Sequence, residues 1–288
     1  MQKDLVQITD NMKRKYISSF MIIAAIACHA LSIGAQTDDE IINAAISFVN
    51  DGITVTLPVK GKSMTPFIMN GENVLLEKSA KYDVGDIVLA HLPEKRFVIH
   101  RVFSRKGDSI TLMGDGNLLG KEHCHLDSLK ALIRYKIDDK GNKIPLCSDS
   151  QKARSELWRV CLSQREMLLS KFSQGTENSF WEELFRTCII SEGKLKLTIR
   201  PVYETKKIGN KIILISKESD NIDFSSLQSL NETASFLFSS MKRKQLNLSE
   251  IVEILMKEYD VDKQIATKDC VNMLTTWFAL GVIRIDSI

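Results

Sequence analysis

The sequence lacks the paired cysteines of a redox or zinc motif. Its six cysteines include no C-x-x-C pair and no zinc-finger spacing, so we expect mostly free thiols. Their number does not decide between an oxidising and a reducing compartment. His123-Cys124-His125 offers metal-ligand side chains, but adjacent residues rarely converge on one ion, so we interpret this segment as a loop. The sequence therefore predicts neither a metal nor a cofactor.

A strong excess of charge is also missing. Lysine and arginine total 39 against 36 acidic residues, for a formal net charge of +3, and this balance does not favour nucleic acid as a partner. Internal repeats and low-complexity runs are absent. The 288 residues are 44% hydrophobic and 26% charged, which is typical of a folded soluble protein with room for two domains.

A long uncharged stretch near the N-terminus follows Lys13-Arg14-Lys15 and covers residues 16–35. A basic segment, an apolar centre and the small residue Ala35 are typical of a secretory signal, with Met12 as the true start. An uncleaved membrane anchor, a lipid-modified Cys28 and a buried amphipathic helix are the alternatives. The charge placement predicts a membrane-associated or exported protein, with the cytoplasm as the alternative location.

Hydrophobic periodicity divides the rest of the chain. Residues 38–50 have helical spacing and end at Asp51-Gly52, and alternating apolar residues then predict a mostly antiparallel β domain. The expected strands are residues 53–59, 74–77, 87–91, 97–102, 109–113 and 129–135. We place a signal or anchor at residues 1–35 and the β domain at 36–145.

A helical connector is expected at residues 146–193, because apolar residues recur there at helical spacing. A second domain at 194–288 begins with strands at 195–202 and 211–216, followed by three helices. Asn231 and Asn247 are their expected N-caps, and Gly281 ends the last helix. The predicted fold class is α+β.

Three segments of the β domain carry chemistry together. Ser63 lies in Gly61-Lys62-Ser63-Met64-Thr65-Pro66, at a turn that can present its Oγ and nearby backbone N–H groups. A serine needs a base within hydrogen-bond reach, and His100 lies in a β segment that follows. Gly114-Asp115-Gly116-Asn117 adds a turn with a carboxylate. Each segment alone has a plainer interpretation, as a turn, a packed histidine and a hairpin.

In this order and spacing the three segments resemble the signal-peptidase and LexA-like serine peptidases. Bacterial members use lysine as the base, whereas His100 before Arg101 resembles the archaeal and endoplasmic-reticulum type of signal peptidase. The resemblance implies Ser63 as nucleophile, His100 as base and the Ser63 N–H as oxyanion donor. Asp115 is expected to orient the imidazole, with Glu122 as a substitute. Met64 and Pro66 are expected to contact substrate.

The C-terminal region resembles the PqqD family, through residues 230–234, 251–252, 258–262 and 280–283. These domains are small winged-helix folds that bind leader peptides as an added strand. The resemblance implies contacts from Ser226 and Leu227 on the third strand and from Val271 and Thr275 on the last helix. A winged helix without a ligand is the alternative, and Lys242-Arg243-Lys244 is a short basic run that fits an exposed loop better than a DNA-reading face.

Together these features predict a serine endopeptidase that cleaves a precursor peptide captured by its leader, with a peptide-modifying enzyme as a further partner. Two other functions are compatible with the sequence. One is a non-catalytic adaptor that brings a precursor to a modifying enzyme. The other is a LexA-like regulator that cleaves itself, which predicts DNA binding and a cytoplasmic location.

Overall fold

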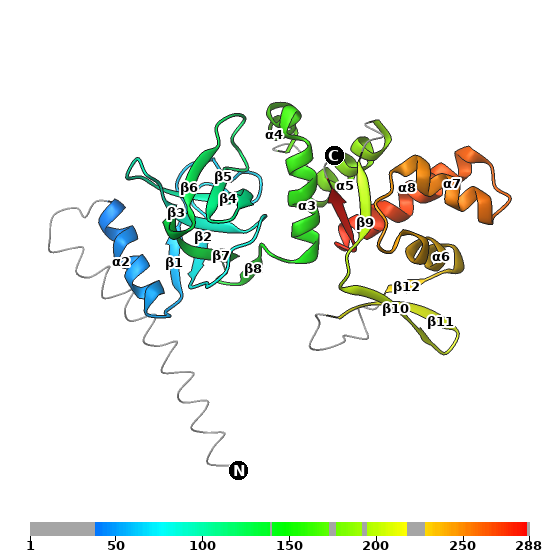
Figure 1. Ribbon diagram of the computed structural model, residues 1–288, viewed down its shortest axis with the longest axis horizontal. Coiled ribbons are helices and arrows are strands. Elements are labelled where there is room, and N and C mark those ends of the chain that lie inside the picture. Colours follow the sequence, from blue (N-terminus) through cyan, green and yellow to red (C-terminus); the bar gives the residue numbers. More distant parts are fainter. Residues whose placement is uncertain (1–37, 139, 173–176, 192–194, 218–227, 287–288) are drawn as a thin grey trace, which may run out of the picture.

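The computed structural model describes residues 38–138, 140–172, 177–191, 195–217 and 228–286. The predicted signal or anchor at residues 1–35 lies outside these ranges, as do Ser226 and Leu227. Within the described ranges no helix has the length and hydropathy to cross a bilayer. The antiparallel β domain, the helices and the small C-terminal α/β region confirm the α+β class (Figure 1).

The N-terminal half is an antiparallel eight-stranded sheet with helix α2 beside it (Figure 1). The strands follow the order β1-β2-β7-β3-β4-β5-β6, and β8 pairs with β7. The bounds are α2 Asp38–Asn50, β1 Val55–Pro58, β2 Asn73–Glu77, β3 Ile87–His91, β4 Phe97–Lys106, β5 Ser109–Met113, β6 Glu122–His125, a 3-10 turn Leu126–Ser128, β7 Leu129–Ile137 and β8 Lys143–Pro145. Three acidic residues open α2, where they complement the positive end of the helix dipole.

Both faces of this sheet are covered, so neighbouring residues of one strand enter different cores. In β4, Val98 and Val102 belong to a small core within the β domain, whereas Phe97 and Ile99 pack against the larger one. This alternation decides which partners His100 and Arg101 can reach.

The connector consists of helices that lie between the sheet and the C-terminal region (Figure 1). Its elements are α3 Asp149–Val160, a 3-10 turn Leu162–Gln164, α4 Arg165–Phe172 and α5 Glu177–Ser191. Ser148 caps α3 by accepting a hydrogen bond from the Gln151 N–H. Trp158 and Trp181 meet edge to face in the connector, with ring centroids 5.8 Å apart.

The described residues of the C-terminal region form five strands and three helices. They are β9 Lys196–Ile199, β10 Tyr203–Ile208, β11 Lys211–Ser216, β12 Gln228–Leu230, α6 Glu232–Met241, α7 Leu248–Glu258, α8 Lys263–Ala279 and β13 Ile283–Asp286. Strands β10, β11 and β12 form one sheet, in which β12 is an edge, and β9 pairs with β13. The predicted caps are confirmed: Asn231 caps α6, and Asn247 forms a capping box with Glu250.

The connector is packed firmly against the C-terminal region. Glu156 of α3 accepts hydrogen bonds from Arg200 Nη2 at 2.7 Å and from the Ile285 N–H at 3.0 Å. Gly281 has a φ of +76° and lies so close to α3 that a Cβ there would be 2.2 Å from the carbonyl carbon of Asp149. One large hydrophobic core consequently runs from the sheet through α3 to α8.

Four of the strands were not predicted from the sequence. Strand β6 occupies the segment interpreted as a loop, β8 follows β7, β10 precedes the turn at Gly209, and β13 follows the last helix. The outer strands β6 and β10 carry many polar residues, which weakens the hydrophobic alternation that reveals a strand. Of these, β6 matters most because it begins with Glu122.

Candidate functional site

The turn at residues 114–117 is pressed against the backbone of the Ser63 segment. The Gly116 N–H donates to the Ser63 carbonyl oxygen at 2.7 Å. A Cβ on Gly114 would be 2.5 Å from that same oxygen, and a Cβ on Gly116 would be 2.3 Å from the Lys62 oxygen. Both positions therefore require glycine, which explains the spacing of this motif.

The strand register brings His100 to the same turn. Arg101 of β4 pairs with Met113 of β5, so His100 and Gly114, the next residues along each strand, come together at the end of this pair. The predicted segments around Ser63, His100 and Asp115 thus meet in the fold, although they are far apart in the sequence.

His100 is buried, with 4% of its surface exposed, and its Nδ1 lies 3.1 Å from Glu122 Oε2. A carboxylate can only accept a hydrogen bond, so Nδ1 carries the hydrogen and Nε2 is left as a proton acceptor. Burial lowers the pKa of His100 below its ordinary value of 6.5, against the opposing charge and hydrogen bond of Glu122. Burial therefore favours the neutral imidazole near neutral pH, and the hydrogen bond to Glu122 fixes its tautomer.

Glu122 has a second partner besides His100, the side chain of Arg96. Its Oε1 pairs with Arg96 Nη2 at 3.2 Å, while the other oxygen faces His100. The Glu122 side chain is 16% exposed and that of Arg96 is 53% exposed, so this end of the chain of contacts reaches the surface.

Asp115 does not contact the imidazole, contrary to our expectation. Its carboxylate forms a buried ion pair with Arg101, whose Nε and Nη2 donate to it at 2.7 to 3.1 Å. Consecutive residues of a strand point to opposite faces, so Asp115 meets Arg101 on one face and Glu122 meets His100 on the other. The structure therefore gives the imidazole contact to Glu122, which the sequence offered only as a substitute.

Ser63 lies half-buried, and its side chain forms no hydrogen bond with any described residue, His100 included. Hydrogen bonds between a nucleophile and its base are often long in a ligand-free site and close only when substrate binds. The Ser63 N–H likewise donates to none of the described residues. A free hydroxyl and a free N–H are what an incoming carbonyl would need at this position.

The side chains of Met64 and Pro66 do not face the surface where a substrate could reach them, contrary to our expectation. Both side chains are buried, and Met64 is 1% exposed within the large core. Phe67 and Ile68 join them there. These residues anchor the turn that carries Ser63, because the buried apolar side chains that follow the serine hold its backbone in place.

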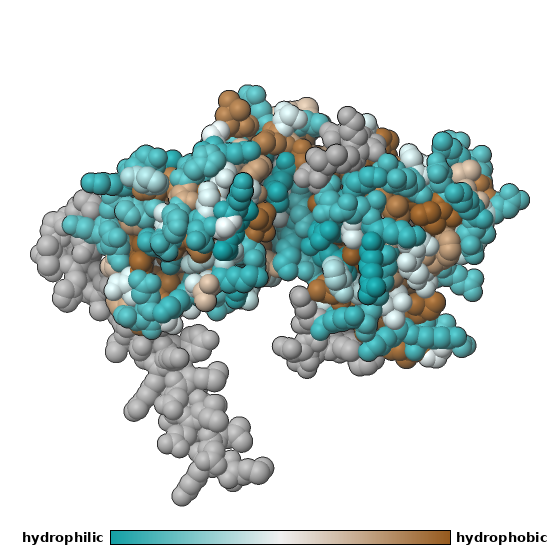
Figure 2. Space-filling model, viewed as in Figure 1, coloured by the Kyte–Doolittle hydropathy of each residue, from teal (hydrophilic) through white to brown (hydrophobic). Residues whose placement is uncertain are grey.

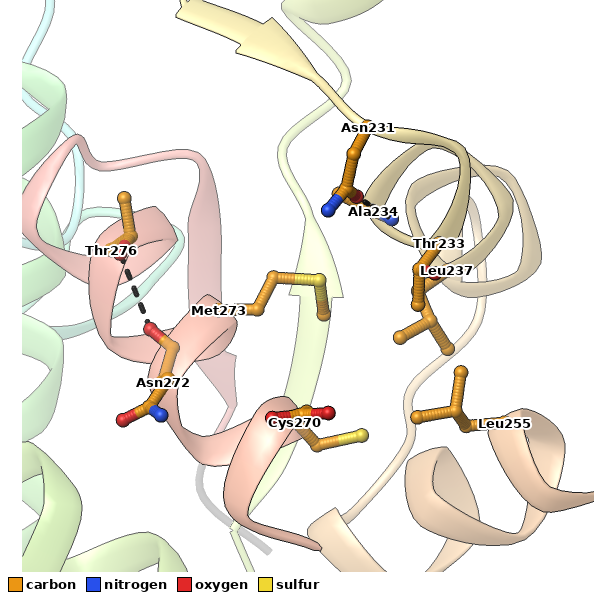
Figure 3. A pocket seen from close by; sticks show the side chains of 10 residues that line it. Asn231, Thr233, Ala234, Leu237, Leu255, Cys270, Asn272, Met273 and Thr276 are labelled. Atoms are coloured by element: carbon orange, nitrogen blue, oxygen red, sulfur yellow. Dashed lines mark hydrogen bonds between the residues drawn. The ribbon is translucent and has the colours of Figure 1, made fainter. Parts of the chain in front are cut away.

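A second candidate site is a groove in the C-terminal region, between α8 and the β12–α6 segment (Figure 3). It consists of two adjoining cavities of about 400 and 380 Å³ that share Asn231, Ala234, Met273 and Thr276. Met273 extends from α8 towards α6 (Figure 3). Elsewhere the surface shown in Figure 2 is mostly hydrophilic, with hydrophobic patches over α7 and α8. Below, "the groove" means these two cavities.

Val271 and Thr275 do not line the groove, contrary to our expectation. Both are buried, and the Thr275 hydroxyl donates to the Val271 carbonyl oxygen at 2.7 Å within α8. Residues four apart share one helix face, and this face packs away from the groove, whereas Met273 and Thr276 lie on the groove side. Val271 instead lines a separate cavity beside the start of α8, together with Lys263 and Thr267.

The histidines of β6 have structural partners. His123 Nδ1 lies 3.2 Å from Thr111 Oγ1, and His125 Nδ1 accepts from the Asp127 N–H. Across the described ranges no three His, Cys, Asp or Glu side chains converge as metal ligands would.

Comparison with known protein families finds one match in each half of the chain. A family model described as "Peptidase S24-like" matches residues 22–132, and one described as "Coenzyme PQQ synthesis protein D (PqqD)" matches residues 212–283. The first match contains Ser63, His100 and Glu122, and the second contains the groove. No curated protein and no solved structure matches the chain.

Proposed function

We propose that this chain, which carries a Peptidase S24-like domain and a C-terminal PqqD domain, is a serine endopeptidase that matures a peptide precursor. The single observation that carries the proposal is the oriented imidazole of His100, buried beside Glu122 at the turn that also holds Ser63. A structural histidine needs no such tautomer, whereas a general base does.

The proposed reaction runs in two steps. Ser63 Oγ attacks the carbonyl carbon of the scissile peptide bond, and His100 Nε2 takes the hydroxyl proton. The tetrahedral oxyanion is stabilised by the Ser63 N–H. The carbon–nitrogen bond then breaks, and His100 returns the proton to the leaving amine. Water, deprotonated by His100, releases the acyl group and restores Ser63.

Glu122 takes the third role in this proposal. Its carboxylate holds the Nδ1–H of His100 and stabilises the imidazolium that forms during each step. Arg96 fixes the other carboxylate oxygen. Asp115 is assigned a structural part, as the buried partner of Arg101 that shapes the turn.

The groove is the proposed binding place of a leader peptide. Strand β12 is an edge whose described residues pair only with β11, so an extended peptide can add beside it through main-chain hydrogen bonds. Met273 offers an apolar contact beside this edge, and Asn231 and Thr276 offer polar ones. Binding here would raise the local concentration of the attached cleavage site near Ser63.

The test uses the full chain and a leader-bearing precursor encoded beside its gene. Wild type is expected to release a defined product, and Ser63→Ala to release none while binding the precursor with unchanged affinity. Mass spectrometry of the product and fluorescence anisotropy of the labelled precursor separate cleavage from binding. Cleavage by Ser63→Ala at the wild-type rate would remove the proposal.

A non-catalytic adaptor is the second candidate function. The observation that favours it is that the Ser63 hydroxyl forms no hydrogen bond with His100 or any other described residue. It predicts precursor binding by the groove, no labelling of Ser63 by a fluorophosphonate probe and no product. A location outside the cytoplasm belongs to the same set of proposals, and fractionation of a chain tagged at Ile288 tests it.

A further inference from the structure

The turn at residues 114–117 is held from its far side by the connector. Trp158 Nε1 donates to the Asp115 carbonyl oxygen at 2.7 Å. Arg165 Nη1 donates to the carbonyl oxygens of Gly114 at 3.3 Å and Asn117 at 3.1 Å. Three of the four carbonyls in this turn therefore bind side chains from α3 and α4. Below, "the clamp" means these two side chains.

Both side chains of the clamp are fully buried. Trp158 is 0% and Arg165 1% exposed, and the guanidinium carbon lies 5.5 Å from the indole centroid. Burying a guanidinium is costly, and this one is bound to two neutral carbonyls of the turn. Arginine suits the role because one planar end group can donate to two carbonyls in a fixed geometry.

The opposite side of the turn supports Ser63. Gly116 donates to the Ser63 oxygen, and neither glycine leaves room for a Cβ between the two segments. A displacement of the turn therefore moves the Ser63 backbone directly. The same turn follows the strand end beside His100.

We propose that Trp158 and Arg165 are positioning residues of the peptidase reaction, which hold Ser63 in place through the backbone of the 114–117 turn. The inference rests on the proposed function. Both residues lie beyond the Peptidase S24-like match at 22–132 and before the PqqD match at 212–283, so the connector of this chain supplies them. Because α3 also binds Arg200 and Ile285, the clamp is anchored in the C-terminal region.

A matched pair of tryptophans tests the indole contact. Trp158→Phe removes a donor that binds the turn, whereas Trp181→Phe removes an equally buried Nε1–H that has no partner among the described residues. We expect Trp158→Phe to lower both kcat and the rate of fluorophosphonate labelling at Ser63 about tenfold, because small displacements of reacting groups cost rate. KM and leader affinity stay as in wild type. Trp181→Phe loses ring packing on Phe67 and Trp158 but no hydrogen bond to the turn, so it labels faster than Trp158→Phe.

Arg165 gives the second arm. Arg165→Met is expected to lower the labelling rate about 100-fold, and Arg165→Lys to recover part of it. The control is Arg154→Met, because Arg154 belongs to α3 but binds Asn178 instead of the turn. Circular dichroism and thermal unfolding verify that each variant is folded.

The outcomes separate this inference from the function on which it rests. A wild-type chain that neither labels at Ser63 nor cleaves the precursor removes both. A wild-type chain that labels, with Trp158→Phe and Trp181→Phe equal to each other in labelling rate and kcat, overturns the clamp alone.

Discussion

The two candidate sites differ in how their polar groups are arranged. In the site at Ser63, the side chains of His100 and Asp115 are buried and each has a charged partner. Three carbonyl oxygens of the 114–117 turn accept hydrogen bonds from the connector. In the groove, an edge strand and exposed side chains such as Thr276 face open space. A site that moves protons needs fixed geometry, whereas a site that adds a peptide strand needs unpaired backbone.

The largest expected effect comes from the imidazole and its partner. His100→Ala and Glu122→Gln should each lower kcat about 10⁴-fold, the loss found when a base or its orienting carboxylate is removed from a catalytic triad. Leader binding to the distant groove should not change. Single-turnover cleavage and anisotropy measure the two quantities, and a Glu122→Gln enzyme as fast as wild type would return the orienting role to another acid.

The main effect of Asp115→Asn should be a lower free energy of unfolding, because Asp115 has a structural role. The change leaves the buried guanidinium of Arg101 without its counter-charge, which costs about 3–5 kcal/mol of unfolding free energy. Urea denaturation gives the value. Asp127→Asn is the surface control, because Asp127 lies in an exposed pair with His125 and should unfold with wild type. Equal denaturation midpoints for the two variants would contradict the structural role of Asp115.

A substitution that fills the groove should change only the affinity for the leader peptide. Thr276→Trp places a large side chain in the groove and should weaken leader binding about tenfold by displacing peptide contacts. Thr267→Trp is the control, because both hydroxyls donate to the carbonyl four residues earlier in α8 but Thr267 lies away from the groove. Unchanged affinity in Thr276→Trp would place the leader elsewhere, while Ser63 labelling should be normal in both variants.

The smallest expected effect is a shift in pH dependence. Burial holds the pKa of His100 below 6.5, so the acidic limb of kcat/KM should lie below that pH, where the neutral base is lost by protonation. Glu122 and Asp115 oppose this lowering and Arg96 adds to it. Residual activity of Glu122→Gln should therefore show its limb at lower pH, and Arg96→Gln at higher pH. Limbs that move in the opposite directions would contradict the assigned contacts.

Much of this arrangement was predictable because its signals are local. Turn residues, hydrophobic alternation and N-caps identified α2, most of the sheet and the three C-terminal helices. Asp115 was expected at the imidazole because its motif stands in the expected place, whereas the carboxylate that meets each face of β4 is decided by the partner strands. Glu122 was undervalued because β6 reads as a polar loop and becomes a strand only by pairing with β5. The clamp has no local signal, since Trp158 and Arg165 contact residues of the turn that lie 43 to 51 positions earlier in the sequence.

The most direct measurement is the site of reaction with a fluorophosphonate probe in the full chain. Intact mass followed by peptide mapping should show a single adduct on Ser63, absent in Ser63→Ala and strongly slowed in His100→Ala. An unlabelled wild type, or an adduct on another serine in a chain that still processes its precursor, would contradict the assignment of Ser63 and His100 as the catalytic pair.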